Sequence, residues 1–336
     1  MSSHDSIQIG LAADARYYPG LFVTVVSIAA HASSGVRLIF NIINGGIERG
    51  KILELEQAVK SRHINSEIRL FTINTNTSAN FPGKMNYARL HFPRLLPEVN
   101  HLVYCDVDLL WTADVVELWH LRDECAYVKS VLDIEFTREH EAKWLKSRGV
   151  EIDAEKYFCS GLMLMNLELF RRHQIADKAA AFIKEHPDIP LFDQTALNAI
   201  LLNIPNGVIH VPCKWQRYAL EVCGDDFKSP IVLHYSGLCP WSGMRVIPDI
   251  VDLWFNVAAA FKRCNVEEVK SQYYSRVAYM IGRTAFFILA RIPAVRIIVL
   301  ATSYITRGKF YASYLRGILR RIDAKDKIEI LLGGEN

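Results

Sequence analysis

Short apolar runs alternate with amphipathic stretches along this chain, and this alternation restricts the possible folds more than any other feature of the sequence. Short apolar runs read as buried strands, and apolar residues spaced three and four apart read as helices. The expected strands are residues 7–12, 37–43, 68–73, 101–105, 205–212 and 231–233, with an apolar run at 162–167 and helices at 19–32 and 47–61. Strands that alternate with helices form a mostly parallel sheet with helices on its faces. We therefore predict an α/β fold.

Two aspartates follow the strand at residues 101–105, in the sequence YCDVDLLW. In an α/β sheet, ligands bind beyond the carboxyl ends of the strands. Asp106 and Asp108 are two positions apart, so along an extended chain their side chains point to the same side and repel each other. A divalent cation removes that repulsion, and carboxylate oxygens suit Mn²⁺ or Mg²⁺. The alternative is a pair of solvated loop carboxylates, because two aspartates at this spacing often occur by chance.

A histidine ends another expected strand, in the sequence IVLHYSGLCPW. The imidazole of His234 is an acceptable third ligand for Mn²⁺, and Gly237 would let the backbone approach a phosphate closely. The alternative is an ordinary histidine at the end of a strand.

Positive charge is concentrated toward the carboxyl end of the chain. The net charge is only +3, yet residues 269–322 contain ten Lys or Arg residues and no Asp or Glu. Residues 284–305 are apolar enough to suggest a membrane span, but Arg291, Pro293 and Arg296 lie near the middle, where charge is costly in hydrocarbon. We expect this region to lie in the membrane interface, with its cations against anionic lipid.

This change in composition predicts a catalytic domain at residues 1–264 and a basic, aromatic, helical region at residues 265–336 that associates with an anionic membrane surface. The alternative is that the helices of the second region pack on the domain with a solvated basic face. Nucleic acid would also attract the charge, but the aliphatic runs between the cations favour lipid, so we expect no nucleic-acid partner.

The seven cysteines are scattered and include no CxxC pair, which suits reduced thiols better than disulfides or a zinc cluster. The first residues lack the basic start and long apolar stretch of a signal peptide. We expect a cytoplasmic protein, peripheral on the inner face of the cytoplasmic membrane.

Five segments, taken in order, resemble glycosyltransferase family 8, which includes glycogenin, plant galactinol synthases and bacterial lipopolysaccharide galactosyl- and glucosyltransferases; the bacterial branch is the most similar. The segments are IGLAADARYY, NYARLHFPRLLP with HLVYCDVDLLW, YFCSGLMLMNLELFRR, LFDQTALN and LHYSGLCPW. The resemblance implies a GT-A nucleotide-diphosphosugar transferase fold and a retaining hexosyltransferase. It would move galactose or glucose from UDP-galactose or UDP-glucose to a lipid-linked saccharide such as lipopolysaccharide core.

The resemblance also implies roles for individual residues. Asp106, Asp108 and His234 would bind one Mn²⁺ (or Mg²⁺) that bridges the donor phosphates. The implied donor-binding residues are Ala12, Asp14, Tyr17, Arg89, Asp106, Val107 and Gly237. Asp14 would hydrogen-bond the uracil or ribose, and Tyr17 would stack on the base unless it is only a surface aromatic. Arg89 would hold sugar hydroxyls or phosphate, its alternative being an arginine on a helix surface. Asp133 falls where relatives place a carboxylate near the donor sugar or acceptor, and we assign it to acceptor binding.

Asp193 and Gln194 match the family's Asp-Gln pair beside the anomeric carbon, which implies catalytic roles. The family's mechanism is disputed. Double displacement needs a nucleophile that these residues could supply, whereas in front-side attack the leaving phosphate takes the proton of the acceptor. An amide is a poor nucleophile, so we favour front-side attack, with Gln194 positioning charge and sugar. The alternative for Asp193 is a helix cap.

Three positions depart from the family pattern. Cys239 stands where a lysine usually supplies positive charge to the diphosphate, a role that Lys214 or Arg245 could take over. Cys159 replaces an asparagine whose amide could bind the sugar, and Arg16 replaces a second asparagine. These departures leave room for an altered donor. They also leave room for reduced activity. The alternatives to the function implied above are a degenerate transferase that serves as a nucleotide- or membrane-binding scaffold and a glycogenin-like self-glucosylating enzyme.

Overall fold

The computed structural model describes residues 6–73, 85–219, 231–236 and 240–242 of the 336 residues. The chain divides into two compact units, one of Met1–Gln216 with Pro230–His234 and the other of Arg217–Ser229 with Tyr235–Asn336. The predicted boundary after residue 264 and the basic region beyond it lie outside the described residues. Within the described residues, no helix reaches the length and apolarity that crossing a membrane requires.

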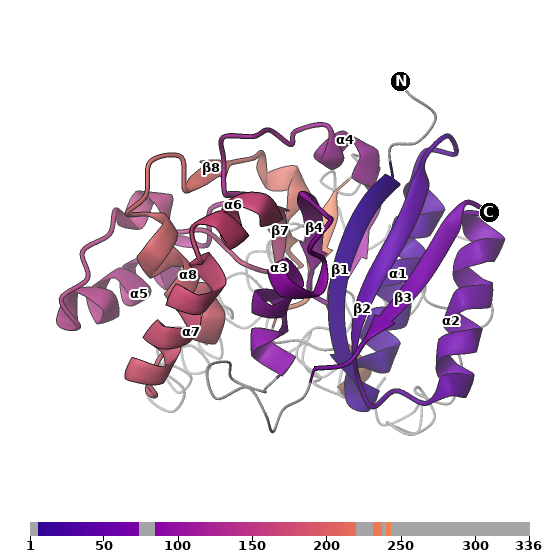
Figure 1. Ribbon diagram of the computed structural model, residues 1–336, viewed down its shortest axis with the longest axis horizontal. Helices are drawn as coiled ribbons and strands as arrows, with labels where there is room; N and C mark the ends of the chain where they lie inside the picture. Colours follow the sequence, from indigo (N-terminus) through magenta and orange to yellow (C-terminus); the bar gives the residue numbers. More distant parts are fainter. Residues whose placement is uncertain (1–5, 74–84, 220–230, 237–239, 243–336) are drawn as a thin grey trace, which may run out of the picture. The chain divides into compact units, whose positions relative to one another are not determined.

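Seven strands form the main sheet of the first unit, in the order β3-β2-β1-β4-β7-β6-β8 (Figure 1). Their bounds are β1 Ser6–Asp14, β2 Arg37–Gly45, β3 Ser66–Phe71, β4 His101–Cys105, β6 Val128–Ser130, β7 Leu162–Asn166 and β8 Val208–His210. β1 is parallel to β2 and β4, β2 to β3, and β6 to β8, whereas β7 is antiparallel to β4 and β6. The mixed, mostly parallel sheet predicted from the sequence is confirmed.

The two central strands, β4 and β7, are buried along their whole length. A strand covered on both faces reads as a continuous apolar run, which explains the sequences HLVYC and LMLMN. β1 and β2 extend two residues beyond the predicted ends, because the pairing of Ala13 with Asn44 and of Asp14 with Gly45 prolongs the parallel ladder. Asp14 is therefore the last residue of β1 and does not lie past its end.

Helices pack around this sheet (Figure 1). Their bounds are α1 Tyr18–His31, α2 Arg49–Arg62, α3 Phe92–Leu95, α4 Val115–Trp119, α5 Glu135–Ser147, α6 Leu167–Arg172, α7 Ile175–Glu185 and α8 Phe192–Leu201. Short 3₁₀ turns are η1 Ala15–Tyr17, η2 Met85–His91, η3 Ala154–Lys156 and η4 Cys213–Trp215. The second unit holds β9 Arg217–Tyr218 and η6 Pro240–Ser242. The helices predicted at 19–32 and 47–61 lie within two residues of α1 and α2.

A second pair of strands in the first unit carries His234, the predicted metal ligand that lies far along the sequence from Asp106 and Asp108. β5 (Leu109–Trp111) is antiparallel to β10 (Val232–His234), with His234 opposite Leu109. Helix α1 supports β5, because Thr24 Oγ1 donates to the Leu109 carbonyl at 2.7 Å. β5 begins only three residues after the end of β4, and its first residue, Leu109, pairs with His234. The end of β4 therefore lies beside His234.

Candidate functional site

The site begins at the carboxyl end of β4, where Asp106 and Asp108 follow a buried strand. The Asp106 N–H donates to the Gly161 carbonyl at 2.7 Å, which ties this loop to the turn before β7. Asp106 Oδ1 accepts hydrogen bonds from Tyr104 Oη and Arg89 Nη2, each at 2.9 Å. One carboxylate oxygen is thus held by the protein, and the loop places the second carboxylate, Asp108, just before β5.

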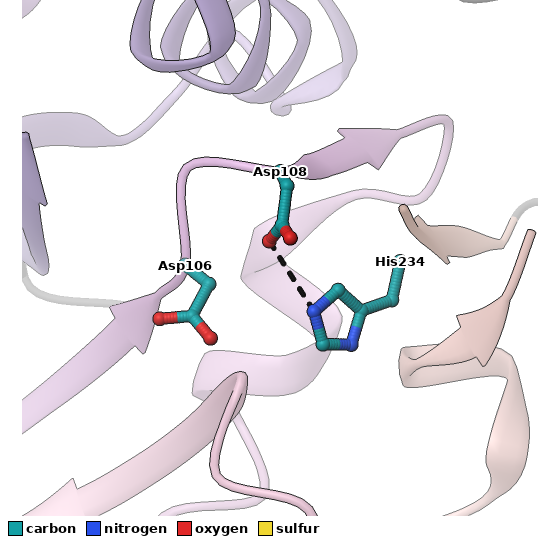
Figure 2. A group of neighbouring side chains, drawn as sticks. All are labelled: Asp106, Asp108 and His234. Carbon is teal, nitrogen blue, oxygen red and sulfur yellow. Dashed lines mark ion pairs between the residues drawn. The ribbon is translucent and has the colours of Figure 1, made fainter. Parts of the chain in front are cut away.

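The structure brings together the three residues predicted as metal ligands. Figure 2 shows Asp106, Asp108 and His234 pointing toward one another. His234 Nε2 lies 3.2 Å from Asp108 Oδ1, and one ligand atom from each of the three residues lies within 4.8 Å of the others. His234 is 4% exposed, so its ring is held inside the protein.

A divalent cation fits this donor set. Carboxylate oxygens and an imidazole nitrogen are ligands for Mn²⁺, and carboxylates alone suit Mg²⁺. The backbone at Gly161 leaves the space beside them open, since a Cβ there would lie 2.7 Å from His234 Cε1 and 3.2 Å from Asp106 Oδ2. A side chain at position 161 would therefore press on two of the three predicted ligands, which glycine avoids.

The charges of the three ligands favour added positive charge. Burial raises the pKa of Asp106, against the opposing effect of Arg89, and the neighbouring Asp108 raises it further. Burial lowers the pKa of His234, but the charge and hydrogen bond of Asp108 raise it, as does contact with Cys159, and the balance lies well above the ordinary value. Both shifts favour proton uptake. A divalent cation would supply the same charge to these carboxylates.

Arg89, in η2, connects the metal ligands to the first turn of α8. Its side chain is 7% exposed and forms ion pairs with Asp106 and Asp193. It also donates to the Ser160 carbonyl and lies over the Tyr104 ring, 4.5 Å from its centroid. Burial lowers the pKa of Arg89, but the two carboxylates raise it, and the net shift is upward. The interpretation of Arg89 as an arginine on a helix surface is wrong, because it is a buried bridge.

Asp193 lies in the first turn of α8 and is 3% exposed. Burial raises the pKa of Asp193 to about 7, with Asp106 adding to the shift and Arg89 opposing it. The preceding residue, Phe192, has φ = 52°, a left-handed conformation that costs a non-glycine residue about 1–3 kcal/mol. The turn that carries Asp193 is therefore held in a strained conformation by its surroundings.

Gln194 and Asp133, predicted from different parts of the sequence, are hydrogen-bonded to each other. Gln194 Nε2 donates to Asp133 Oδ2 at 2.7 Å. Gln194 Oε1 accepts from the backbone N–H of Ser160 at 2.9 Å and from its hydroxyl at 3.3 Å. The other oxygen of Asp133 accepts from the Ile134 N–H at 2.7 Å. Both ends of the Gln194 amide are therefore engaged by protein groups.

The residues predicted to bind the nucleoside lie at the carboxyl end of β1, which pairs with β4. Asp14 Oδ1 accepts from the N–H groups of Arg16 and Tyr17 at 2.8 and 3.2 Å, and its Oδ2 pairs with Arg16 Nη2 at 3.1 Å. Tyr17 is 38% exposed, and Ala12 lies in β1 opposite Ile43. Parallel neighbours end at the same edge, so these residues lie at the edge of the sheet that carries Asp106.

Of the three positions that depart from the family pattern, the structure describes Arg16 and Cys159. Gly237, Cys239 and Arg245 lie outside the described residues. Lys214 Nζ pairs with Glu117 at 2.7 Å and lies over the Trp215 ring, so its described partners are protein groups. Cys159 is buried, and its contact with His234 places it beside the metal ligands.

Sequence reasoning missed three residues that build the site. Ser160 contacts both Arg89 and Gln194, Gly161 leaves room beside the ligands, and Tyr104 holds Asp106. In the sequence, CSG directly precedes the apolar run at 162–167, and a glycine there could as well serve only a turn. Its close approach to His234 depends on a pairing between distant strands, which a single sequence does not reveal.

Comparison with known proteins gives a family match over most of the chain. The model of Glycosyl transferase family 8 matches residues 8–244. General stress protein A of Bacillus subtilis (strain 168) is 32% identical over 197 residues, which is 56% of this chain and 65% of that protein. The match thus spans slightly less than two thirds of that relative's length.

Two further relatives are more distant. Lipopolysaccharide 1,2-glucosyltransferase of Escherichia coli (strain K12) is 22% identical over 272 residues, covering 74% of this chain and 77% of that protein. The crystal structure of galactosyltransferase LgtC in complex with donor and acceptor sugar analogues superposes with a TM-score of 0.61 at 21% identity. The superposition covers 77% of this chain and 97% of LgtC. At 21% sequence identity, this similarity concerns the fold alone.

Proposed function

Because the chain belongs to glycosyltransferase family 8 and has the GT-A fold of its structural neighbours, we propose that it is a retaining hexosyltransferase. It would transfer galactose or glucose from a UDP-sugar to a lipid-linked glycan such as lipopolysaccharide core. The observation that carries this proposal is the convergence of Asp106, Asp108 and His234, whose ligand atoms lie within 4.8 Å of one another at the carboxyl end of β4. The similarity to Lipopolysaccharide 1,2-glucosyltransferase supports the choice of acceptor.

Asp106, Asp108 and His234 would hold Mn²⁺ or Mg²⁺. When bound, such a cation would offset the negative charge that UDP gains as it leaves. Tyr104 and Arg89 hold Oδ1 of Asp106, so Oδ2 is the oxygen that faces Gly161 and the neighbouring ligands. The protein thereby fixes one carboxylate before the donor arrives and avoids reorganisation during the reaction.

The surroundings of Gln194 favour front-side attack over double displacement. A nucleophilic amide would have to present its oxygen to the anomeric carbon, yet Gln194 Oε1 accepts two hydrogen bonds from Ser160. Asp193, the other possible nucleophile, is buried in its ion pair with Arg89. We infer that Gln194 and Asp193 position the donor sugar, and that Asp133 faces the acceptor side through its contact with Gln194.

The nucleoside would bind at the end of β1, with Asp14 against the uracil or ribose and Tyr17 against the base. Tyr17 is exposed enough to stack on a base, and Asp14 is held by the N–H groups of η1. Val107, Ala12 and Gly237 complete the proposed donor contacts.

Turnover of the donor tests this function. With Mn²⁺, the full chain is expected to hydrolyse UDP-galactose or UDP-glucose, or to transfer the hexose from it to an acceptor. This activity is expected to be lost in EDTA. Asp108→Asn is expected to lower turnover by about 10²–10³-fold, because a charge-stabilising group is lost. Asp177→Asn, at a partly exposed aspartate on α7, is the matched control and is expected to keep wild-type turnover. If neither UDP-sugar is turned over and Asp108→Asn leaves UDP affinity unchanged, the scaffold alternative replaces the transferase.

We also infer that the protein works at the inner face of the cytoplasmic membrane, from the ten cations and the aromatic residues at 269–322. The full chain is expected to float with vesicles that contain phosphatidylglycerol and to be released by high salt, because interfacial cations are screened. Equal flotation with neutral phosphatidylcholine vesicles would contradict the electrostatic part of this inference, and no flotation with either would contradict membrane association.

A further inference from the structure

A carboxylate lies buried behind Gln194, on a helix to which the proposed reaction assigns no role. Glu141 is 1% exposed and shares the inward face of α5 with Thr137 and Leu145, at intervals of four residues. An apolar residue would fill such a position at lower cost, because a buried carboxylate needs hydrogen bonds to offset its lost hydration. The groups that supply these hydrogen bonds indicate what Glu141 does.

The hydroxyl groups that donate to Glu141 lie next to Gln194, either along the chain or in space. Glu141 Oε2 accepts from Thr195 Oγ1 at 2.5 Å and from Tyr157 Oη at 3.4 Å. The other oxygen, Oε1, lies 3.2 Å from Nδ1 of the exposed His140. Thr195 follows Gln194 in α8, and Tyr157 Oη lies 3.5 Å from Gln194 Nε2. The Tyr157 hydroxyl therefore lies between the carboxylate and the amide, whereas the Thr195 hydroxyl joins the carboxylate to the residue next to Gln194.

The direction of these hydrogen bonds follows from Glu141 Oε2, which accepts from both hydroxyls. Tyr157 has one hydroxyl proton and donates it to Glu141, so toward Gln194 its oxygen can only accept. Burial and the nearby carboxylate raise the pKa of Tyr157 well above its ordinary value, which keeps that proton in place. This matches the orientation in which Gln194 Nε2 faces both Asp133 and Tyr157 while Oε1 accepts from the N–H of Ser160.

The same carboxylate also orders the start of α8. Thr195 Oγ1 donates to Glu141 and accepts from the Leu191 N–H at 3.1 Å. Leu191 precedes Phe192, whose positive φ strains the turn that carries Asp193. A hydroxyl fixed at both ends holds this turn in its strained conformation.

We propose that Glu141 is a positioning residue: through the Tyr157 hydroxyl it supports the orientation of the Gln194 amide, and through the Thr195 hydroxyl it supports the first turn of α8. Its effect on turnover rests on the function proposed above, whereas the orientation of the amide does not depend on that function. Two separate measurements therefore test it.

The first measurement is the side-chain amide resonance of Gln194 in the full chain labelled with ¹⁵N-glutamine, assigned by its loss in Gln194→Glu. Glu141→Leu and Tyr157→Phe each remove one partner of the network, so each is expected to shift or broaden this resonance. Glu139→Gln, at an exposed glutamate on the same helix, is the matched control and is expected to leave the resonance unchanged.

The second measurement is steady-state kinetics with the UDP-sugar. Glu141→Leu is expected to lower kcat by about 10–100-fold, the scale of effect that small misplacements of reacting groups produce, while KM for the donor stays near that of the wild type. Glu141→Gln, whose Oε1 can still accept from both hydroxyls, is expected to retain more turnover. The effects of Glu141→Leu and Tyr157→Phe should not add in the double variant, because both act through one network.

An unchanged Gln194 resonance together with an unchanged kcat in Glu141→Leu would overturn the proposal, even if that variant were less stable. If Glu141→Leu fails to fold, Tyr157→Phe and Glu141→Gln carry the same two measurements, and wild-type values in both would also overturn it. If the wild-type protein turns over no UDP-sugar, the proposed function fails, and the amide resonance alone decides the role of Glu141.

Discussion

The two ends of the site handle buried charge in opposite ways. Around Asp106, Asp108 and His234, two carboxylates are gathered with an imidazole, and the raised pKa values of Asp106 and His234 favour uptake of positive charge. Around Gln194 and Asp133, the amide and the carboxylate have partners within the protein. The donor set of the first end suits a cation, whereas the second end holds its side chains in a fixed geometry. Arg89 is the connection between them, since it pairs with Asp106 and with Asp193.

Replacing Arg89 is expected to have the largest effect, a loss of unfolding free energy. Arg89→Met would leave the buried Asp193 and the partly exposed Asp106 without their cation, and breaking a buried pair in this way costs about 3–5 kcal/mol of unfolding free energy. Urea denaturation of the metal-free protein measures this loss. Arg94→Met removes a more exposed arginine that pairs with Asp177, and it should cost less than about 1 kcal/mol. Equal losses in the two variants would show that Arg89 is not the connection between two differently built regions.

A smaller effect is expected from a substitution that touches only the metal end of the site, which consists of Asp106, Asp108 and His234. Gly161→Ala would place a Cβ 2.7 Å from His234 Cε1, and overpacking of this kind costs about 1–3 kcal/mol. If the strain falls on the ligands, Mn²⁺ affinity drops by about tenfold or more, as calorimetric titration would measure. At Gly35 an added Cβ meets nothing within 4 Å, so Gly35→Ala should bind Mn²⁺ like the wild type. Undiminished affinity in Gly161→Ala would argue against an ion beside position 161.

The smallest expected effect is a pH dependence of the same end. The pKa of His234 is raised above its ordinary 6.5, so in the metal-free protein its contribution to stability is present at low pH and is lost as pH rises through the raised pKa. Metal binding needs the neutral imidazole. Mn²⁺ affinity should therefore rise with pH up to that pKa, by at most about tenfold per pH unit for one proton. Thermal stability measured with and without Mn²⁺ should diverge as pH rises, and parallel curves would mean that the ion does not displace this proton.

The metal end could be predicted from the sequence because each of its ligands directly follows or ends a strand. Asp106 and Asp108 come after the run HLVYC, and His234 ends IVLH. Strands β1, β2 and β4 leave clear apolar runs, so the frame that carries these residues can also be predicted. β5 and β6 are not predicted, because β5 follows β4 after only three residues and β6 has a lysine at its centre.

The amide end could be predicted only in part, because its supporting residues look ordinary in the sequence. Glu141 lies in the helix EFTREHEAKWLKS, whose many charges are typical of a solvated surface, and only the packing of α5 shows that it is buried. Ser160 acts largely through its backbone, which any residue would supply. The contact between Gln194 and Asp133 joins two segments that a single sequence does not relate.

The pairing of β10 with β5 also bears on which changes of chain length this protein could accept. Three residue pairs, supported by hydrogen bonds between Thr112 and Ile231, set which side chain of β10 faces Asp108. A deletion inside β10 would bring Leu233 to that side, because neighbouring residues of a strand face opposite ways. The length of β10 is therefore constrained by the face on which His234 must lie.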